Sequence, residues 1–274
     1  EWAKELQKPK SIVAAQMLLN PLEGAETRFD VRTLQFWEVR PKRINVYITV
    51  DPSKGRWASS DSTAIVVTGM DVGRNKYVLD GWCHRMTLSR RWQILRDAHR
   101  AWSRVEGVGF VAVGYEQFGL QGDNEYFEER MRHEGYPFPI TELAWPRQGR
   151  QSKEQRIERL EPDVRMGRWR LPRVIQVDDE GNVRPYDPSR IKEAEAAKRI
   201  GEGWRVAKPI HKIDEDGKLY DFVTKFLDEF VFFPAAPADD ILDAASRIYD
   251  MDPQPPVHYD DTPGGARSTE PAGF

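Results

Sequence analysis

Residues 44–70 of the chain, INVYITVDPSKGRWASSDSTAIVVTGM, decide its fold. The first eight are rich in β-branched side chains and end in Asp51, a pattern that predicts a strand. The stretch DPSKGRWASSDS is rich in Gly, Ser and Asp and predicts a turn, after which TAIVVTGMDV predicts a second strand. KYVLDGWCH, residues 76–84, follows the short turn GRN and predicts a third strand. We therefore expect a three-stranded antiparallel meander.

Helical and strand patterns alternate along the rest of the chain. Ser89 and Ser152 are expected to cap two helices, and Gly135 is expected to close another. The expected helices are residues 89–105, 124–135, 151–167, 218–233 and 238–251, and the further expected strands are 109–116, 139–145 and 168–172. This order predicts an α/β fold with a mixed central β-sheet flanked by helices.

The domain organisation follows from changes in composition. Residues 1–43 are expected to be a lead-in or linker segment with a helix near 1–19, and residues 44–252 the folded domain. Within it, residues 174–217 carry turn signals and predict an insertion with a hairpin and a short helix near 191–200. Residues 253–274 are rich in Pro and Gly and predict a disordered tail.

Composition excludes several classes of protein. The single cysteine, Cys83, excludes a disulfide framework and a cysteine-rich zinc site. The sequence has no apolar run long enough to span a membrane, so no membrane partner is expected. A net charge of −3 argues against a protein held on DNA by charge alone, but it fits one that gathers carboxylates in one place.

Acidic residues stand at the ends of the expected elements. Asp51 ends the first strand and Glu116 the fourth, while Asp239, Asp240 and Asp243 begin the last helix. If the two strands are parallel neighbours, Asp51 and Glu116 emerge side by side, at the sheet edge where α/β folds place their chemistry. Carboxylates that converge repel one another unless a hard divalent cation such as Mg²⁺ or Mn²⁺ binds them. Taken singly, each acid is more typical of a turn or a helix N-cap than of a functional site, and only the order and spacing of all of them favour the site.

Other candidates surround these acids. Asp61 precedes the second strand and is either an auxiliary metal contact or a turn residue. The basic residues Arg147, Arg150, Lys153 and Arg156 precede and line one helix, where they predict contacts with DNA phosphates. The alternative is a solvated helix face on which Glu154 and Glu158 supply ion pairs.

Four motifs in order resemble the nuclease domain of phage large terminase subunits, which belong to the RNase H-like superfamily. They are YITVDPSKG with SDSTAIVV, VAVGYEQFGLQGD, SKEQRIERLEPDVRMGRWRLP and PADDILDAAS. QMLLNPLEG in the lead-in is similar to the linker before such domains, so the resemblance covers roughly residues 10–250. One departure is Ala238, because many relatives have His just before the closing acidic pair.

The resemblance implies an endonuclease that cleaves double-stranded DNA with two Mg²⁺ or Mn²⁺ ions during viral genome packaging. It places the metal ligands at Asp51, Glu116 and Asp243 and leaves open whether Asp239 or Asp240 joins them. Asp51 would bind both ions. The implied partners are duplex DNA, the ATPase domain of the same terminase subunit, the portal and the small terminase subunit. The implied location is the host cell cytoplasm, transiently at the procapsid portal.

Two rivals stay open. One is another RNase H-like nuclease, such as a Holliday-junction resolvase or a transposase. The other is a catalytically silent domain that docks DNA or the portal. The sequence has no GxxxxGK[ST] phosphate loop, so the motor's ATPase is not expected within it, which fits an isolated nuclease domain.

Overall fold

The computed structural model describes residues 28–29, 33–37, 40–53, 62–116, 121–144, 149–172, 175–177, 183–185 and 210–257. The helix expected near residues 1–19 lies outside these ranges, as do the helix expected near 191–200 and the tail from residue 258.

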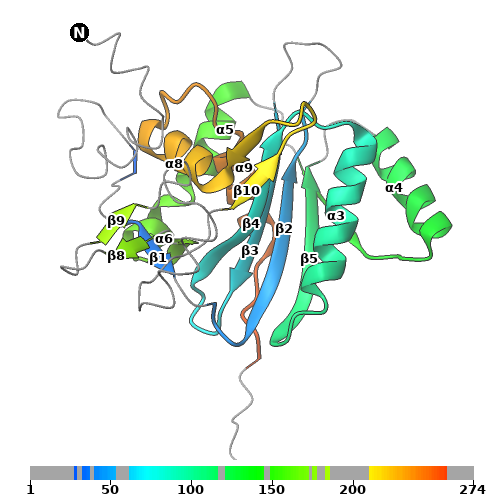
Figure 1. Cartoon of the computed structure of the whole chain (residues 1–274), viewed down its shortest axis with the longest axis horizontal. Helices are drawn as coiled ribbons and strands as arrows, with labels where there is room; N and C mark the ends of the chain where they lie inside the picture. The colour runs from blue at the N-terminus through cyan, green and yellow to red at the C-terminus, as the bar shows by residue number, and fades with distance from the viewer. Residues whose placement is uncertain are drawn as a thin grey trace, which may run out of the picture.

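A mixed seven-stranded sheet forms the centre of the fold, with strand order β1-β7-β4-β3-β2-β5-β6 (Figure 1). β2 pairs antiparallel with β3 and β3 with β4, which confirms the predicted meander. β5 runs parallel to β2 and to β6, and β7 runs parallel to β4 and to β1. The strands are β1 Gln35–Trp37, β2 Ile44–Asp51, β3 Thr63–Met70, β4 Lys76–His84, β5 Val108–Glu116, β6 Ile140–Leu143 and β7 Trp169–Pro172.

Helices cover both faces of this sheet, which confirms the predicted α/β class with a mixed central β-sheet flanked by helices. The first face packs α3 (Leu88–Trp102) and α4 (Gln121–Glu134), and the second packs α5 (Gly149–Glu158), α6 (Glu161–Arg165), α8 (Phe222–Phe232) and α9 (Asp240–Ser246). A 3₁₀ helix, η2 (Arg247–Met251), continues α9. Two hairpins form separate two-stranded sheets, β8 (Ile175–Val177) with β9 (Val183–Pro185) and β10 (His211–Ile213) with β11 (Leu219–Asp221).

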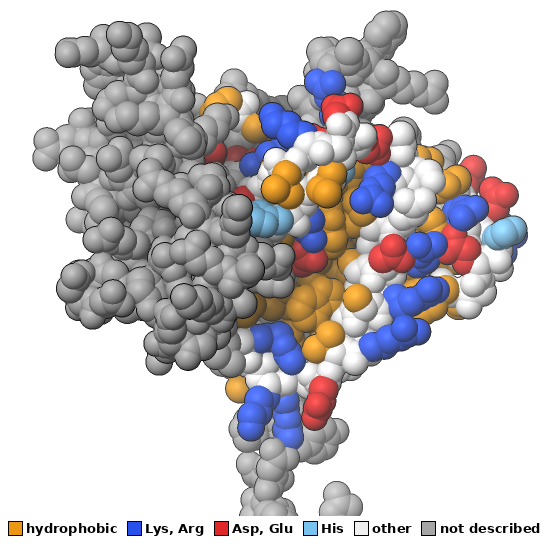
Figure 2. Space-filling view, in the orientation of Figure 1, with side chains coloured by type: hydrophobic (Ala, Val, Ile, Leu, Met, Phe, Trp, Pro, Cys, Tyr) orange, Lys and Arg blue, Asp and Glu red, His pale blue; other side chains and the backbone are white. Residues whose placement is uncertain are grey.

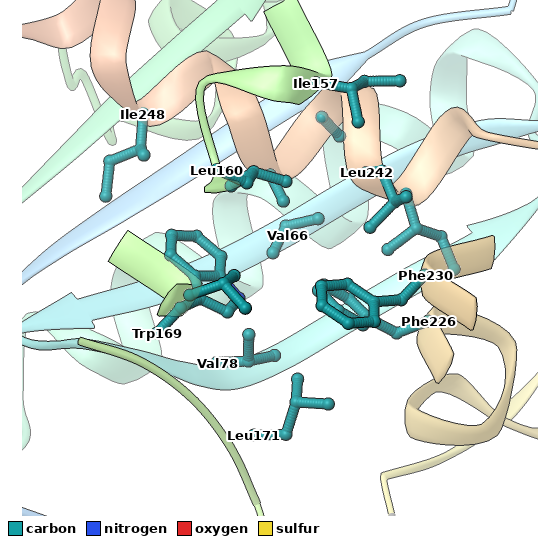
Figure 3. Close-up of a cluster of buried hydrophobic side chains, with 14 of the residues drawn as sticks. Val66, Val78, Ile157, Leu160, Trp169, Leu171, Phe226, Phe230, Leu242 and Ile248 are labelled. Carbon is teal, nitrogen blue, oxygen red and sulfur yellow. The ribbon is translucent and has the colours of Figure 1, made fainter. Parts of the chain in front are cut away.

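Side-chain alternation along the strands builds one core on each face. In β2, Val46, Ile48 and Val50 pack under α3, while Tyr47 faces the α8–α9 side. Figure 3 shows the second core, where Trp169 and Val78 of the sheet lie among helix side chains that include Leu242 and Phe230. Because successive side chains of a strand point to opposite faces of the sheet, the polar residues that end β2 and β5 also point to one face or the other.

The strand and helix boundaries correct several expectations. Thr87, not Ser89, caps α3, because its side chain accepts from the backbone N–H of Arg90 at 3.2 Å. The helix expected over 151–167 is two helices, since α5 begins at Gly149, before Ser152, and Pro162 begins the first turn of α6. The first residues of the helix expected over 218–233 form β11 instead.

Two segments outside the expected sheet contribute to the fold. β1 lies in the expected lead-in and pairs with β7, while Phe29 is buried and stacks on Phe230 with ring centroids 4.6 Å apart. Past the last helix, the backbone carbonyl of Gln254 accepts hydrogen bonds from Tyr47 Oη at 2.9 Å and Asn45 Nδ2 at 3.0 Å. The first residues after the predicted end of the domain therefore lie against the sheet.

No helix in the described ranges is both long and apolar enough to cross a bilayer. On the face drawn in Figure 2, Lys and Arg side chains are interspersed with Asp and Glu.

Candidate metal centre

Three carboxylates meet at one edge of the sheet. Asp51, Glu116 and Asp243 each offer an oxygen, and these oxygens lie within 4.8 Å of one another. The side chains are almost fully shielded from solvent, with residue exposures of 8%, 0% and 1%. We call these residues the acidic trio.

The sheet positions two members of the acidic trio. Parallel pairing of Val50 with Tyr115 brings the ends of β2 and β5 together, so Asp51 stands beside Glu116. Alternation turns both carboxylates away from α3, because Val50 and Tyr115 belong to the core on that side. The strand pattern therefore delivers two acids to the same face at the same edge.

The helix α9 supplies the third member. Asp239 is the N-cap residue, and the first turn of α9 carries Asp240 and Asp243. The residues that follow Asp243, Ala244 and Ala245, are fully buried, so this helix lies close to the sheet. Its N-terminus also favours negative charge.

Glu229 of α8 fixes that helix end from below. Its Oε2 accepts the backbone N–H groups of Ile241 at 2.9 Å and Leu242 at 3.0 Å, which Asp239 leaves uncapped. Burial raises the pKa of Glu229 to about 8, against the lowering effect of its backbone hydrogen bonds. The sequence analysis did not identify this residue.

Arg156 of α5 holds Asp243 through two hydrogen bonds. Nε donates to Oδ1 at 3.0 Å and Nη2 donates to Oδ2 at 2.7 Å, the bidentate geometry that fixes a carboxylate most firmly. Arg156 is only 6% exposed. A guanidinium that is buried against a carboxylate is not presented to a DNA phosphate, so this position does not fit the phosphate contact expected from the sequence.

Arg247 of η2 holds Glu116 from the other side. Its Nε donates to Glu116 Oε2 at 2.9 Å, and its Nη1 donates to Asp250 Oδ2 at 2.8 Å. η2 lies close to β5 here, since a Cβ at Gly114 would lie 2.7 Å from the Met251 sulfur and would displace that side chain. The sequence analysis missed Arg247, although it follows Asp243 by one helical turn within a buried, alanine-rich stretch.

Lys153 of α5 lies beside the acidic residues at the N-terminal end of α9. Its Nζ is 2.7 Å from Asp239 Oδ1, 3.3 Å from Asp240 Oδ1 and 3.7 Å from Asp243 Oδ2. The side chain is 24% exposed, in contrast to the buried Arg156 one turn away. We call Asp239 and Asp240 the outer pair.

The electrostatics of the acidic trio reflect burial and mutual repulsion. Burial raises the pKa of Asp51 well above its ordinary value, and the nearby Asp243 and Glu116 raise it further. Burial also raises the pKa of Glu116, although Arg247 opposes the shift. For Lys153, burial lowers the pKa, but attraction to Asp51 and Asp243 prevails and raises it.

The residues of the acidic trio fit a hard divalent cation. Glu116 Oε1 is buried and has no hydrogen-bond partner, a costly arrangement for a carboxylate oxygen. Within the described residues, the Asp51 carboxylate forms no hydrogen bond or ion pair. Three carboxylates form an all-oxygen donor set of the kind that Mg²⁺ and Mn²⁺ prefer.

The structure thus brings Asp51, Glu116 and Asp243 together. The outer pair shares Lys153 with Asp243 as a common ion-pair partner. Asp61 and Arg147 lie outside the described residues, and so does the side chain of Arg150. Their expected roles stay predictions.

No family model matches the sequence, and no curated protein matches it significantly. Solved structures with partial similarity are nuclease domains of large terminases. The nuclease from thermophilic phage G20c aligns at 15% identity over 79% of this chain and 91% of that one, with a TM-score of 0.38. The same nuclease with bound magnesium aligns at 17% identity over 81% and 96%, with a TM-score of 0.40. The human cytomegalovirus terminase nuclease domain, soaked with Mn, aligns at 12% over 59% and 75%, with a TM-score of 0.35.

Proposed function

We propose that this chain is a metal-dependent endonuclease that cuts double-stranded DNA during viral genome packaging, as the nuclease domain of a large terminase subunit. The acidic trio carries the proposal, because three buried carboxylates within 4.8 Å of one another are costly unless a cation binds them. The resemblance of the ordered sequence motifs to large terminase nuclease domains supports double-stranded DNA as the substrate and genome packaging as the setting. We propose the portal, the small terminase subunit and the ATPase domain as partners, and the host cytoplasm as location.

Each acid has a distinct place in this proposal. Asp51 lies in the acidic trio without a hydrogen bond from the described residues, so it would be the ligand shared by two ions. Glu116 would bind through its unpartnered Oε1, while Arg247 holds Oε2. Asp243 would bind through the lone pairs that Arg156 leaves, with one residue of the outer pair as a further ligand.

When bound, Mg²⁺ or Mn²⁺ supplies the charge that activates water for attack on phosphorus and stabilises the oxygen that leaves. The chain's own residues orient the carboxylates and limit water. Arg156 and Arg247 act as positioning residues, because each fixes one carboxylate and offsets one negative charge. Lys153, whose side chain is 24% exposed, is placed to meet a phosphate of the incoming strand.

Cleavage of supercoiled plasmid tests the proposal. The assay compares Mn²⁺, Mg²⁺ and EDTA for the whole chain, for Asp51→Asn, and for Asp216→Asn as an acid outside the site in the β10–β11 turn. We expect metal-dependent nicking and linearisation that Asp51→Asn loses and Asp216→Asn keeps. Cleavage that survives Asp51→Asn would contradict the site.

The substrate arm separates the proposal from its rivals. Linear duplex and four-way junction DNA are offered at equal concentration, and a packaging nuclease is expected to cut both without preference for the junction. Selective cutting of the junction would favour a resolvase. DNA binding without cleavage in either metal would favour a silent docking domain.

A further inference from the structure

The side chain of Lys153 supplies the positive charge beside the outer pair. Lys153 Nζ lies between the outer pair and Asp243, at 2.7, 3.3 and 3.7 Å from one oxygen of each. These are the oxygens that an ion on this side of the site would bind. The ammonium therefore stands where part of a metal's coordination shell would be.

The excess of negative charge in the acidic trio and the outer pair explains why Lys153 lies beside them. Five carboxylates face three cationic side chains, which leaves two negative charges in a mostly buried volume. The carboxylates are Asp51, Glu116, Asp239, Asp240 and Asp243, and the cations are Lys153, Arg156 and Arg247. Without Lys153 the imbalance would grow, and like charges at short range destabilise the fold.

The three cationic side chains differ in how easily each can move away from the carboxylates that it contacts. Arg156 and Arg247 are buried and hold carboxylates through paired or branched hydrogen bonds. Lys153 is partly exposed, contacts the outer pair at its exposed rim and has a flexible stem that can swing to solvent. Displacement of Lys153 leaves both arginine clamps in place.

We propose that Lys153 is a resident counter-ion of the centre, and that a divalent ion which uses the outer pair must displace its ammonium. This inference rests on the proposed function and concerns how the same site loads. An ion held by Asp51 and the unpartnered oxygen of Glu116 meets less competition, because Lys153 forms its direct ion pairs with the outer pair and Asp243 and acts on Asp51 only through longer-range attraction. The first ion therefore binds more tightly than the second while Lys153 is present. Displacement also frees the ammonium for a DNA phosphate.

Direct metal binding without DNA tests the inference. Mn²⁺ is titrated into the whole chain by calorimetry, with free Mn²⁺ counted by electron paramagnetic resonance. Lys153→Gln removes the competing charge and is expected to tighten the weaker class of ions by about tenfold, equal to about 1.4 kcal/mol. Lys153→Arg keeps a cation and is expected to leave that class weak. Lys218→Gln, in the β10–β11 turn, is the matched control and is expected to behave as the unsubstituted chain.

The outcomes separate this inference from the proposed function. Identical isotherms for the unsubstituted chain and Lys153→Gln would overturn the inference, and plasmid cleavage by the unsubstituted chain would show that the nuclease proposal still stands. Equal tightening in Lys153→Gln and Lys153→Arg would also overturn it, because charge would not be the cause. Failure of every variant to bind Mn²⁺, together with no cleavage, would remove both proposals.

Discussion

Arg247→Met removes the countercharge of Glu116 while it keeps a side chain of similar length and apolar stem. Both residues are buried, at 1% and 0% exposure, and the pair is joined at 2.9 Å by the arginine Nε. Glu116 Oε1 is already buried without a hydrogen-bond partner, and the substitution removes the arginine donor of Oε2 as well. The side chain of Asp250 loses one of its two arginine contacts but keeps that of Arg159.

The expected cost is large because one charge of a buried pair is left behind. Loss of one partner from such a pair destabilises a protein by about 3–5 kcal/mol. For a domain of this size each kcal/mol corresponds to roughly 2–4 °C in melting temperature, so we expect a drop of roughly 6–20 °C. Protonation of Glu116 relieves the cost. Its pKa is already raised in the folded protein and rises further without Arg247, so the deficit should shrink as the pH falls and grow as it rises.

Thermal melts of the metal-free chain between pH 5 and pH 9 measure this effect. The matched variants are Glu116→Gln and the double variant with Arg247→Met, which complete a double-mutant cycle. We expect the double variant to melt above Arg247→Met, since no buried charge is left without a partner. A melting temperature for Arg247→Met close to that of the unsubstituted chain, or additive effects in the cycle, would refute the reasoning.

Three further predictions follow from other positions. Asp51→Asn removes a carboxylate whose pKa is raised by burial and repulsion, so the metal-free variant should melt higher at pH 8. It should also lack the stabilisation by Mn²⁺ that we expect for the unsubstituted chain; an equal response of both to Mn²⁺ would contradict this. Glu229→Gln replaces a carboxyl with a pKa of about 8, whose stabilising effect is full at acid pH and is lost as the pH rises through that value. The free energy of unfolding in urea should therefore change less between pH 6 and pH 9 in the variant than in the unsubstituted chain. An equal change in both would argue against the raised pKa. Gly81→Ala places a Cβ inside the ring of Phe222, which should cost about 1–3 kcal/mol in urea unfolding and be partly restored by Phe222→Leu; a neutral effect would show that α8 packs differently.

Local patterns predicted most of the sheet and its acids. The strands β2 and β4 occupy the residues expected, because runs of β-branched side chains between turn signals leave little choice of boundary. The same reasoning places Asp51 and Glu116 at strand ends and brings them side by side if the two strands are parallel neighbours, and the parallel pairing of β2 with β5 meets that condition. Asp243 was placed by its spacing within a helix that the sequence marks clearly.

The remaining features depend on contacts between distant parts of the chain. Glu116 and Arg247 are 131 positions apart, and Arg156 and Asp243 are 87 apart, so no local spacing indicates that they pair. Arg156 belongs to a run of basic residues before and along one helix, and such a run predicts phosphate contact, which is why Arg156 was expected to contact DNA. β1 has three residues, too few for a period-two pattern to stand out.

Anomalous diffraction from crystals soaked in Mn²⁺ tests the central claim most directly. We predict a Mn²⁺ peak within bonding distance of oxygens of Asp51, Glu116 and Asp243, and its loss in crystals of Asp51→Asn. A well-ordered trio with no anomalous peak at saturating Mn²⁺, or Mn²⁺ bound elsewhere while plasmid is still cut, would contradict the assignment of these carboxylates as the metal centre.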